Sequence, residues 1–339
     1  MALRTPLVAL LLGLLVLAAG LQVAGYDAVN ALAALWDGAA GSWYAITSAT
    51  LVRAVPLIII GLGIALAFRG GAFNIGAEGQ FYAGAIAATW VGLHVGGRPW
   101  ALAATSVLLA GTLAGMAWVL VPVWLKLRFG VLEVISTLLL NFVAESLVSL
   151  MVQGPLQESQ HIYPQSDPIV EAARLPFLPG TRLHAGLLLA LLGAAALWYV
   201  FARTLWGFRL RAVGAGPRAA EISGRIDARR MGAVALLVSG ALAGLAGGVE
   251  VSGVSYALFQ NLSPGYGFTA IAVALLARLH PAGVIATGIL FGALEAGAGA
   301  MQRDAGVPAV AVYVVEAVVI VVVLLAEASA RRSMARVAA

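Results

Sequence analysis

Residues 73–80 read FNIGAEGQ, a short polar stretch inside a chain that is 62% hydrophobic. It combines a carboxylate, two carboxamides and two glycines. In hydrocarbon an unpaired polar group is strongly unfavourable, so glycine-broken backbone at membrane depth persists only where protein or a water-filled path surrounds it. The stretch therefore predicts a route or a site inside a membrane-embedded helical bundle.

The composition of the whole chain points the same way. The 339 residues have a mean hydropathy of +0.98, only 10% are charged, and there is no cysteine. Because a membrane-spanning helix needs roughly 20 apolar residues, the chain has room for about ten of them and for no sizeable soluble domain. We expect an all-α integral membrane protein, one transmembrane domain over residues 1–339, with interrupted or re-entrant segments. The expected spans are residues 6–25, 50–68, 72–93, 100–125, 131–152, 183–202, 231–251, 266–278, 282–299 and 307–326.

The basic residues predict orientation rather than nucleic-acid binding, although the pI is about 9.9. They lie at the ends of the expected spans, and with a cytoplasmic N-terminus all but five of the 20 fall on the inner side. The five outside are Arg53, Arg98, Arg174, Arg182 and Arg303. Both termini and residues 203–230 are then cytoplasmic, residues 153–182 form an ordered external loop, and the protein is a multi-pass protein of the bacterial inner membrane. In an alternative interpretation, residues 1–25 are a signal peptide.

The cytoplasmic segment 203–230 carries seven arginines and a short predicted helix. Pro217 suits the first turn of a helix and Gly224 suits its end. The two turns between them would form a rod of roughly 10 Å, shaped to dock into another protein. The alternative is a solvated loop that binds lipid headgroups.

Several carboxylates fall within or beside the expected spans, where ionisable groups usually face an interior or a cavity. Glu78, Glu145 and Glu250 are the candidates for function. Each could instead cap a helix or bond a neighbouring backbone group. Asn141 lies four residues before Glu145, hence on the same helix face. The others are Glu133, Glu295 and Glu316.

Residues 66–80 and 242–256 share a pattern of small residues, paired glycines, a glutamate and then aromatic residues. Duplicated halves with interrupted helices are frequent in transporters. The pattern fits either an internal repeat or a bias in composition.

Signatures of enzymes are missing from the sequence. It has no His-Glu-x-x-His pair, no Gly-x-Ser-x-Gly elbow and no P-loop, because its only lysine, Lys126, follows a leucine. We therefore expect a transport subunit rather than an enzyme, with no cofactor of its own. If transport is driven by ATP, then ATP and Mg²⁺ belong to a separate ATPase chain.

Three stretches carry a resemblance to a known family: residues 73–80, residues 213–224 followed by 239–247, and residues 263–281. In them the chain resembles the permease subunits of bacterial ABC importers of the ribose and branched-chain amino acid permease superfamily. It is most similar to the branch for nucleoside uptake that works with a basic-membrane-protein-type lipoprotein. The resemblance implies a second, usually non-identical permease, a cytoplasmic ABC ATPase and an extracytoplasmic substrate-binding lipoprotein as partners.

The resemblance also implies roles for residues. Residues 214–224 would form the helix that couples to the ATPase, whereas residues 73–80 and 266–269 would lie on broken segments along the translocation path. The expected coupling residues are Gly214, Pro217, Arg218, Ala219, Ala220, Glu221, Ser223 and Gly224. With the carboxylates above, the expected path residues are Phe73, Asn74, Glu78, Gln80, Asn141, Glu145, Glu250, Tyr266, Phe268 and Thr269; no metal site is expected.

Two alternative functions and one departure from the family pattern are left open by the sequence. The same machinery could import a simple sugar or a branched-chain amino acid. An ion-coupled secondary transporter could use Glu78 or Glu250 as a proton relay. The family typically has an aliphatic residue directly after the glycine at Gly224, but here Arg225 precedes Ile226, which leaves the end of the coupling helix open.

Overall fold

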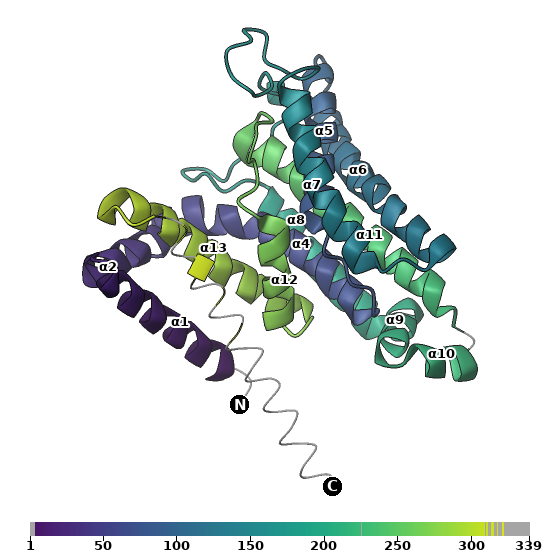
Figure 1. Ribbon diagram of the computed structural model, residues 1–339. Helices are drawn as coiled ribbons and strands as arrows, with labels where there is room; N and C mark the ends of the chain where they lie inside the picture. The colour runs from purple at the N-terminus through teal and green to yellow at the C-terminus, as the bar shows by residue number, and fades with distance from the viewer. Residues whose placement is uncertain are drawn as a thin grey trace. The chain divides into compact units, whose positions relative to one another are not determined.

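A computed structural model describes residues 4–224 and 226–308, with residues 310, 313–314, 317 and 321. The described part of the chain contains helices and two isolated β-bridges but no strand (Figure 1). The elements are α1 (Arg4–Val23), α2 (Ala28–Ala39), α3 (Trp43–Ala45), the π-helix η1 (Ile46–Thr50), α4 (Leu51–Arg69), α5 (Ala77–His94), α6 (Trp100–Phe129), α7 (Glu133–Val152), the 3₁₀-helix η2 (Glu171–Ala173), α8 (Gly186–Arg203), α9 (Leu205–Ala215), α10 (Pro217–Gly224), α11 (Ala228–Glu250), the π-helix η3 (Val251–Ser255), α12 (Tyr266–Leu276) and α13 (Pro281–Ala305).

Six helical stretches among the described residues are long and apolar enough to cross a membrane. They are Trp43–Arg69, Trp100–Phe129, Glu133–Val152, Gly186–Arg203, Ala228–Ser255 and Pro281–Ala305. The shorter apolar helices Leu11–Val23 and Tyr266–Leu276 join them. The fold is thus all-helical with several potential spans, while the expected number of about ten is not confirmed. Most of the expected span 307–326 lies outside the described residues.

Two helices were not predicted from the sequence. The Asp27 carboxylate caps α2 by accepting hydrogen bonds from the N–H groups of Val29 and Asn30, and the Thr204 hydroxyl caps α9 by accepting one from Gly207. Side chains of this kind satisfy N–H groups that the first turn of a helix leaves unpaired. The segment between α8 and α11 is therefore largely helical.

The chain divides into two compact units, one of residues 1–54 with 289–339 and one of residues 55–288. In the first unit the Thr50 hydroxyl donates a hydrogen bond of 2.6 Å to the carbonyl of Ala39, which joins η1 to the end of α2. The second unit contains the broken stretch 73–80, all of α10 and all of the expected path residues.

Glycines bring α5, α6 and α11 into close contact in the second unit. A Cβ at Gly111 of α6 would lie 2.8 Å from the carbonyl oxygen of Gly244 in α11, and a Cβ at Gly84 of α5 would overlap the same residue. Small residues at helix crossings let backbones approach closely, which is a common way to pack helices in a membrane. These helices form a tightly packed support for the stretch that enters α5.

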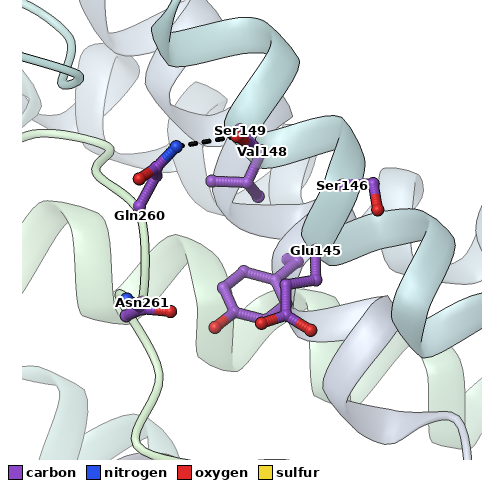
Figure 2. Close-up of a pocket in the computed structure, with 7 residues that line it drawn as sticks. Glu145, Ser146, Val148, Ser149, Gln260 and Asn261 are labelled. Atoms are coloured by element: carbon purple, nitrogen blue, oxygen red, sulfur yellow. Dashed lines mark hydrogen bonds between the residues drawn. The ribbon is translucent and has the colours of Figure 1, made fainter.

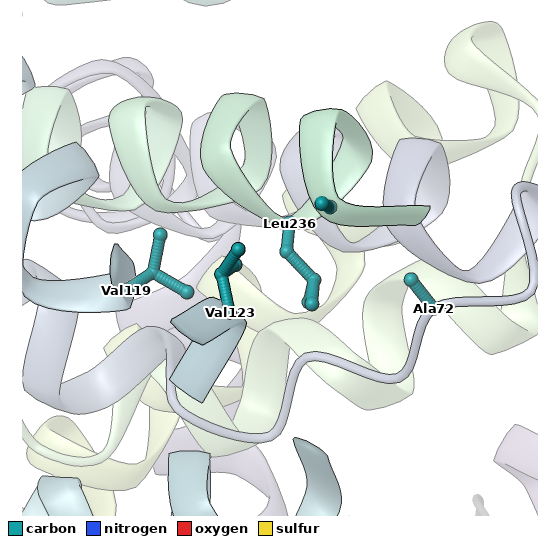
Figure 3. Close-up of a cluster of buried hydrophobic side chains, with 5 residues drawn as sticks. Ala72, Val119, Val123 and Leu236 are labelled. Atoms are coloured by element: carbon teal, nitrogen blue, oxygen red, sulfur yellow. The ribbon is translucent and has the colours of Figure 1, made fainter. Parts of the chain in front are cut away.

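A small apolar cluster anchors the chain just before that stretch. Val119 and Val123 from α6 meet Leu236 from α11 and Ala72 from the connection between α4 and α5 (Figure 3). Ala72, Val119 and Leu236 are completely buried. The cluster therefore fixes the position at which the polar stretch begins.

Residues 153–182 are an ordered connection with a short helix, η2. The backbone N–H groups of Ser166, Ile169 and Leu175 donate hydrogen bonds of 2.7–2.8 Å to the carbonyls of Leu258, Tyr256 and Ser252. These bonds tie the connection to η3 and to the segment that follows it.

Two carboxylates organise the first part of this connection. Glu158 accepts hydrogen bonds from the Gln165 amide and the Tyr163 N–H, and Asp167 accepts bonds from the hydroxyl and N–H of Ser159. These bonds favour the charged forms and lower the pKa of Glu158 and of Asp167 below their ordinary values of 4.5 and 3.8.

The order of residues 158–167 should consequently depend on pH. A carboxylate with a lowered pKa stabilises the folded form fully above its ordinary pKa, and this stabilisation is lost as the pH falls through the lowered value. We expect hydrogen-exchange protection factors of the Ser159 and Tyr163 amides, corrected for intrinsic rates, to be constant at neutral pH and to drop below about pH 4. A variant with both Glu158→Gln and Asp167→Asn should show a flat profile, and equal protection of the unmodified chain at pH 3 and pH 7 would contradict the prediction.

Candidate functional site

The helical path of the chain is interrupted between α4 and α5. Gly71 has a φ of 75°, in the left-handed region that glycine adopts without strain, and residues 72–76 are not helical before α5 begins at Ala77. The predicted polar stretch 73–80 therefore comprises a non-helical entry and the first turn of α5. Its backbone groups need partners outside a regular helix.

The side chains of Asn74 and Gln80 provide some of these partners. Asn74 Nδ2 donates to Gln80 Oε1 at 2.8 Å, and Gln80 Nε2 donates back to Asn74 Oδ1 at 3.0 Å. Asn74 also donates to the Ser239 hydroxyl of α11 at 2.9 Å and accepts from the Gly76 N–H at 3.0 Å. Asn74, Gln80 and Ser239 are at most 1% exposed. This network holds the interrupted segment against α11.

Helix α7 supplies further partners through Asn141 and Thr137. Asn141 Oδ1 accepts from the Gly79 N–H at 2.8 Å, and its Nδ2 donates to the Ile75 carbonyl at 2.9 Å. The Thr137 hydroxyl accepts from the Ile75 N–H at 3.3 Å. The predicted path residue Asn141 thus contacts the interrupted segment directly, and the predicted polar face of residues 131–152 faces it at this point.

An ion pair fixes the beginning of the segment. Lys126 Nζ lies 2.6 Å from Glu133 Oε1, and the same oxygen accepts from the Phe73 N–H at 3.4 Å. Sequence reasoning placed Glu133 at a helix edge but assigned it no partner. The pair connects α6, α7 and the entry to α5.

Glu78 joins the first broken segment to the second. Its Oε2 accepts a hydrogen bond of 2.6 Å from the N–H of Gly267 in the first turn of α12, and the Ser263 hydroxyl also bonds to this carboxylate. A helix N-terminus carries unpaired N–H groups and partial positive charge, so it suits a carboxylate. The two stretches that the resemblance assigned to the path therefore meet at Glu78.

The close approach of these segments requires glycine at position 267. A Cβ there would overlap the backbone of Ala77 and Glu78. Ser263 completes the turn by accepting bonds from the N–H groups of Gly265 and Tyr266. The sequence Ser-Pro-Gly ahead of an apolar run is typical of a capped helix start, and this signal could have identified Ser263.

Glu145 lies apart from this contact, in a pocket of about 280 Å³ (Figure 2). The pocket is formed by one face of α7 and by the non-helical segment after η3. Gln260 Nε2 donates to the Ser149 hydroxyl across it at 2.7 Å. The residues labelled there are Glu145, Ser146, Val148, Ser149, Gln260 and Asn261, and Tyr82 of α5 completes the lining.

The other expected path residues differ in how much of each side chain is exposed. Glu250 and Tyr266 are each 6% exposed, and Tyr266 packs edge-on against Phe81 with ring centroids 5.9 Å apart. Phe73 and Phe268 are 49% and 45% exposed, whereas Thr269 is half-buried. The structure thus brings Asn74, Gln80 and Asn141 together around the first segment but leaves both phenylalanines on the surface.

The short helix predicted between Pro217 and Gly224 is present as α10. The resemblance extended this helix back to Gly214, but Gly214 lies in α9, which ends at Ala215 before the non-helical Gly216. Arg218, Ala219, Glu221 and Gly224 are exposed, as is Pro217, whereas Ala220 is buried. Ile222 is 84% exposed. Sequence reasoning did not select Ile222, although an isolated aliphatic residue in an arginine-rich segment was a usable signal. The side chain of Ser223 and all of Arg225 lie outside the described part.

Helix α9, which leads into α10, packs against the bend at Gly71 that precedes the interrupted segment. A Cβ at Gly71 would lie 3.6 Å from the Cα of Gly214, and a Cβ at Gly214 would overlap the carbonyl of Arg69. The backbones of α9 and of the bend are therefore in contact. Among the described residues, no group of three or more His, Cys, Asp or Glu residues is arranged to hold a metal ion.

Comparison with known proteins supplies the family. The chain is 38% identical to a guanosine ABC transporter permease of Bacillus subtilis, over 95% of this chain and 92% of that protein. It is 36% identical to a glucose ABC transporter permease of Haloferax volcanii, over 96% and 88%, and 33% identical to a nucleoside ABC transporter permease of Lactococcus lactis, over 93% and 88%. No solved structure matches.

Bacillus subtilis and Lactococcus lactis each have a second, more distant relative. These are a guanosine permease that is 29% identical over 73% of this chain and a nucleoside permease that is 27% identical over 71%. Residues 46–324 match the family model described as branched-chain amino acid transport system / permease component. The chain belongs to this family of ABC transporter permeases.

Proposed function

We propose that this chain is one of two permease subunits of an ATP-driven importer for nucleosides. The proposed substrate class rests on the 38% identity to a guanosine permease over 95% of the chain. A second nucleoside permease, at 33% identity, supports it independently. The position of Glu78 between the two broken segments supports a transport role for residues 73–80 and 266–269.

The pairs of relatives in two organisms support a second, non-identical permease as partner. An ABC ATPase would bind at α10 on the cytoplasmic side, hydrolyse ATP with Mg²⁺ and drive the cycle. An extracytoplasmic binding lipoprotein would deliver the nucleoside near residues 153–182. This arrangement requires a multi-pass inner-membrane protein with both termini in the cytoplasm, as the distribution of basic residues predicts.

Uptake competition tests the substrate. Cells that express the chain with its partners should accumulate labelled guanosine, and unlabelled nucleosides should suppress the uptake while glucose and leucine have no effect. The glucose permease of Haloferax volcanii makes a sugar the second candidate, because that relative is 36% identical. If unlabelled glucose suppresses the uptake of labelled glucose and no guanosine is taken up, a sugar becomes the proposed substrate instead of a nucleoside.

The coupling to ATP is tested in the same cells. A protonophore that collapses the proton gradient while ATP is maintained should leave uptake unchanged. Loss of uptake under these conditions would favour an ion-coupled mechanism through Glu78 or Glu250.

A further inference from the structure

The polar pocket between α7 and residues 256–265 has a composition that suits a sugar (Figure 2). We propose that this pocket binds two adjacent hydroxyl groups of the sugar ring of the transported solute, with Glu145 accepting hydrogen bonds from both. The proposal rests on the proposed function, since a nucleoside presents such a pair on its ribose. It assigns a specific binding role to residues outside the contact between Glu78 and α12.

The two sides of the pocket come from different parts of the chain. Glu145 and Ser149 lie four residues apart on α7, so they share one helix face, and Ser146 borders them. Gln260 and Asn261 lie on the opposite side. Asn261 has a φ of 58°, a left-handed conformation that asparagine tolerates better than most residues. This bend occurs where the segment passes the pocket.

A hydrogen-bonded frame holds the pocket in shape and leaves polar groups of its lining able to bind a ligand. The Ser149 oxygen accepts bonds from Gln260 Nε2 at 2.7 Å and from Gln153 Nε2 at 2.8 Å. With both acceptor positions occupied, the Ser149 hydroxyl can still donate its hydrogen. Within the described part of the chain, neither a hydrogen bond nor an ion pair engages the Glu145 carboxylate or the Asn261 amide.

These free groups match the chemistry of a diol. An ionised carboxylate has two acceptor oxygens and can receive a hydroxyl on each, while the diol oxygens can accept from an amide and a serine hydroxyl. An acidic residue bonds the ribose hydroxyls in the same way at many dinucleotide sites. The volume of about 280 Å³ is near the lower end of small-molecule pockets, which reach roughly 300–1,000 Å³. The pocket is thus large enough for a sugar ring and little more.

The location also suits a first contact for the incoming solute. Ser149 and Gln260 lie in the last turn of α7 and in the segment that residues 153–182 contact, which is the external side in the predicted orientation. A solute released there by a binding protein would meet the pocket before it reached Glu78. A polar mouth filled only with water is the competing interpretation.

The test uses the complete transporter in proteoliposomes, with its partner permease, ATPase and binding protein. Uptake of guanosine and of 2′,3′-dideoxyguanosine, which lacks the diol, is measured for the unmodified chain and for Glu145→Gln. Because the binding protein is the same in both assemblies, any change in the ratio of the two uptake rates arises in this chain. We expect Glu145→Gln to lower guanosine uptake at subsaturating concentration about tenfold and to leave the dideoxy analogue nearly unchanged, since a bond to a charged group is lost.

The variants Gln260→Ala and Asp304→Asn complete the design. Gln260→Ala removes part of the frame and should shift the ratio in the same direction, which keeps the proposal testable if Glu145→Gln fails to assemble. Asp304→Asn changes an exposed acid at the end of α13 that does not line the pocket, and it should behave like the unmodified chain.

The outcomes separate this inference from the proposed function. Equal losses for guanosine and its dideoxy analogue, or an unchanged ratio, would overturn the diol site while nucleoside uptake itself stood. If the transporter carries glucose instead of nucleosides, the same comparison is made with glucose and 2,4-dideoxyglucose, which has no two adjacent hydroxyl groups on its ring. A selective loss for glucose in Glu145→Gln would then retain the diol site although the nucleoside proposal had failed, and a parallel loss would overturn both.

Discussion

Changing Ile222 to aspartate should remove the ATPase from the purified transporter and reduce ATP-driven uptake to background. Ile222 is 84% exposed on α10, within the arginine-rich segment 203–230. A docked ATPase would bury this side chain, and a central apolar contact of an interface often contributes 2 kcal/mol or more, or about thirtyfold in affinity. A charged residue there would in addition lose its hydration. The measurement is the amount of ATPase that co-purifies with the tagged chain.

The conservative variant Ile222→Leu is the matched control and should retain the ATPase. Ala219→Trp should act like Ile222→Asp, because Ala219 lies on the exposed side of α10. Ala220→Trp is unsuitable, since Ala220 is 6% exposed and a large residue there would distort α10 itself. Full retention of the ATPase by Ile222→Asp and Ala219→Trp would show that α10 does not dock it.

Changing Glu78 to glutamine should leave the transporter assembled but lower uptake at least about tenfold, because the bond from Gly267 to a carboxylate is replaced by a weaker bond to a neutral amide. The glutamine Oε1 can still accept from Gly267, so the turn before α12 keeps its partner. What is lost is the charge at the N-terminus of α12. Assembly is measured by co-purification of both permeases and uptake by proteoliposome assay.

Glu78→Ala provides the comparison for this prediction. It leaves the Gly267 N–H without its acceptor in a buried position, which costs about 1–3 kcal/mol, and should lower the thermal stability of the complex. Asp304→Asn, at the exposed end of α13, controls for the removal of a carboxylate elsewhere. Normal uptake by Glu78→Gln would show that Glu78 only caps α12 and has no role in transport.

The contacts within residues 55–288 suggest how the two variants are connected. The backbone of Gly214 meets the bend at Gly71, and the bend leads through the Asn74 and Gln80 network to Glu78. Under the proposed function, a displacement of α9 and α10 by the ATPase would be transmitted to α12 through these packed groups. The tight glycine packing of α5, α6 and α11 would make the support of this path stiff.

The sequence was informative wherever local chemistry decides the structure. Pro217 and Gly224 predicted the first and last residues of α10, and the glycines of residues 70–79 predicted an interruption. Asp27 and Thr204 were equally local caps that sequence reasoning overlooked. The paired glycines show the limit: Gly71 forms a bend, whereas Gly247 and Gly248 lie within α11, so the two similar stretches have different local structures.

The candidate site depended on contacts that no local pattern contains. Asn74 meets Ser239 and Glu78 meets Gly267 across 165 and 189 residues of sequence. Gly79 and Asn141 are 62 residues apart. Such pairings follow from the packing of whole helices. The sequence therefore identified polar residues of the interior but neither their partners nor the pocket beside Glu145.

Under the proposed function, this chain transports only when a separate ATPase acts on it. The decisive measurement is ATP hydrolysis and uptake by the purified chain with its partner permease in liposomes, with and without the ATPase and the loaded binding protein. We predict no uptake by the permeases alone, and hydrolysis that rises when the loaded binding protein is added to the full assembly. Uptake by the permeases without an ATPase would contradict the account.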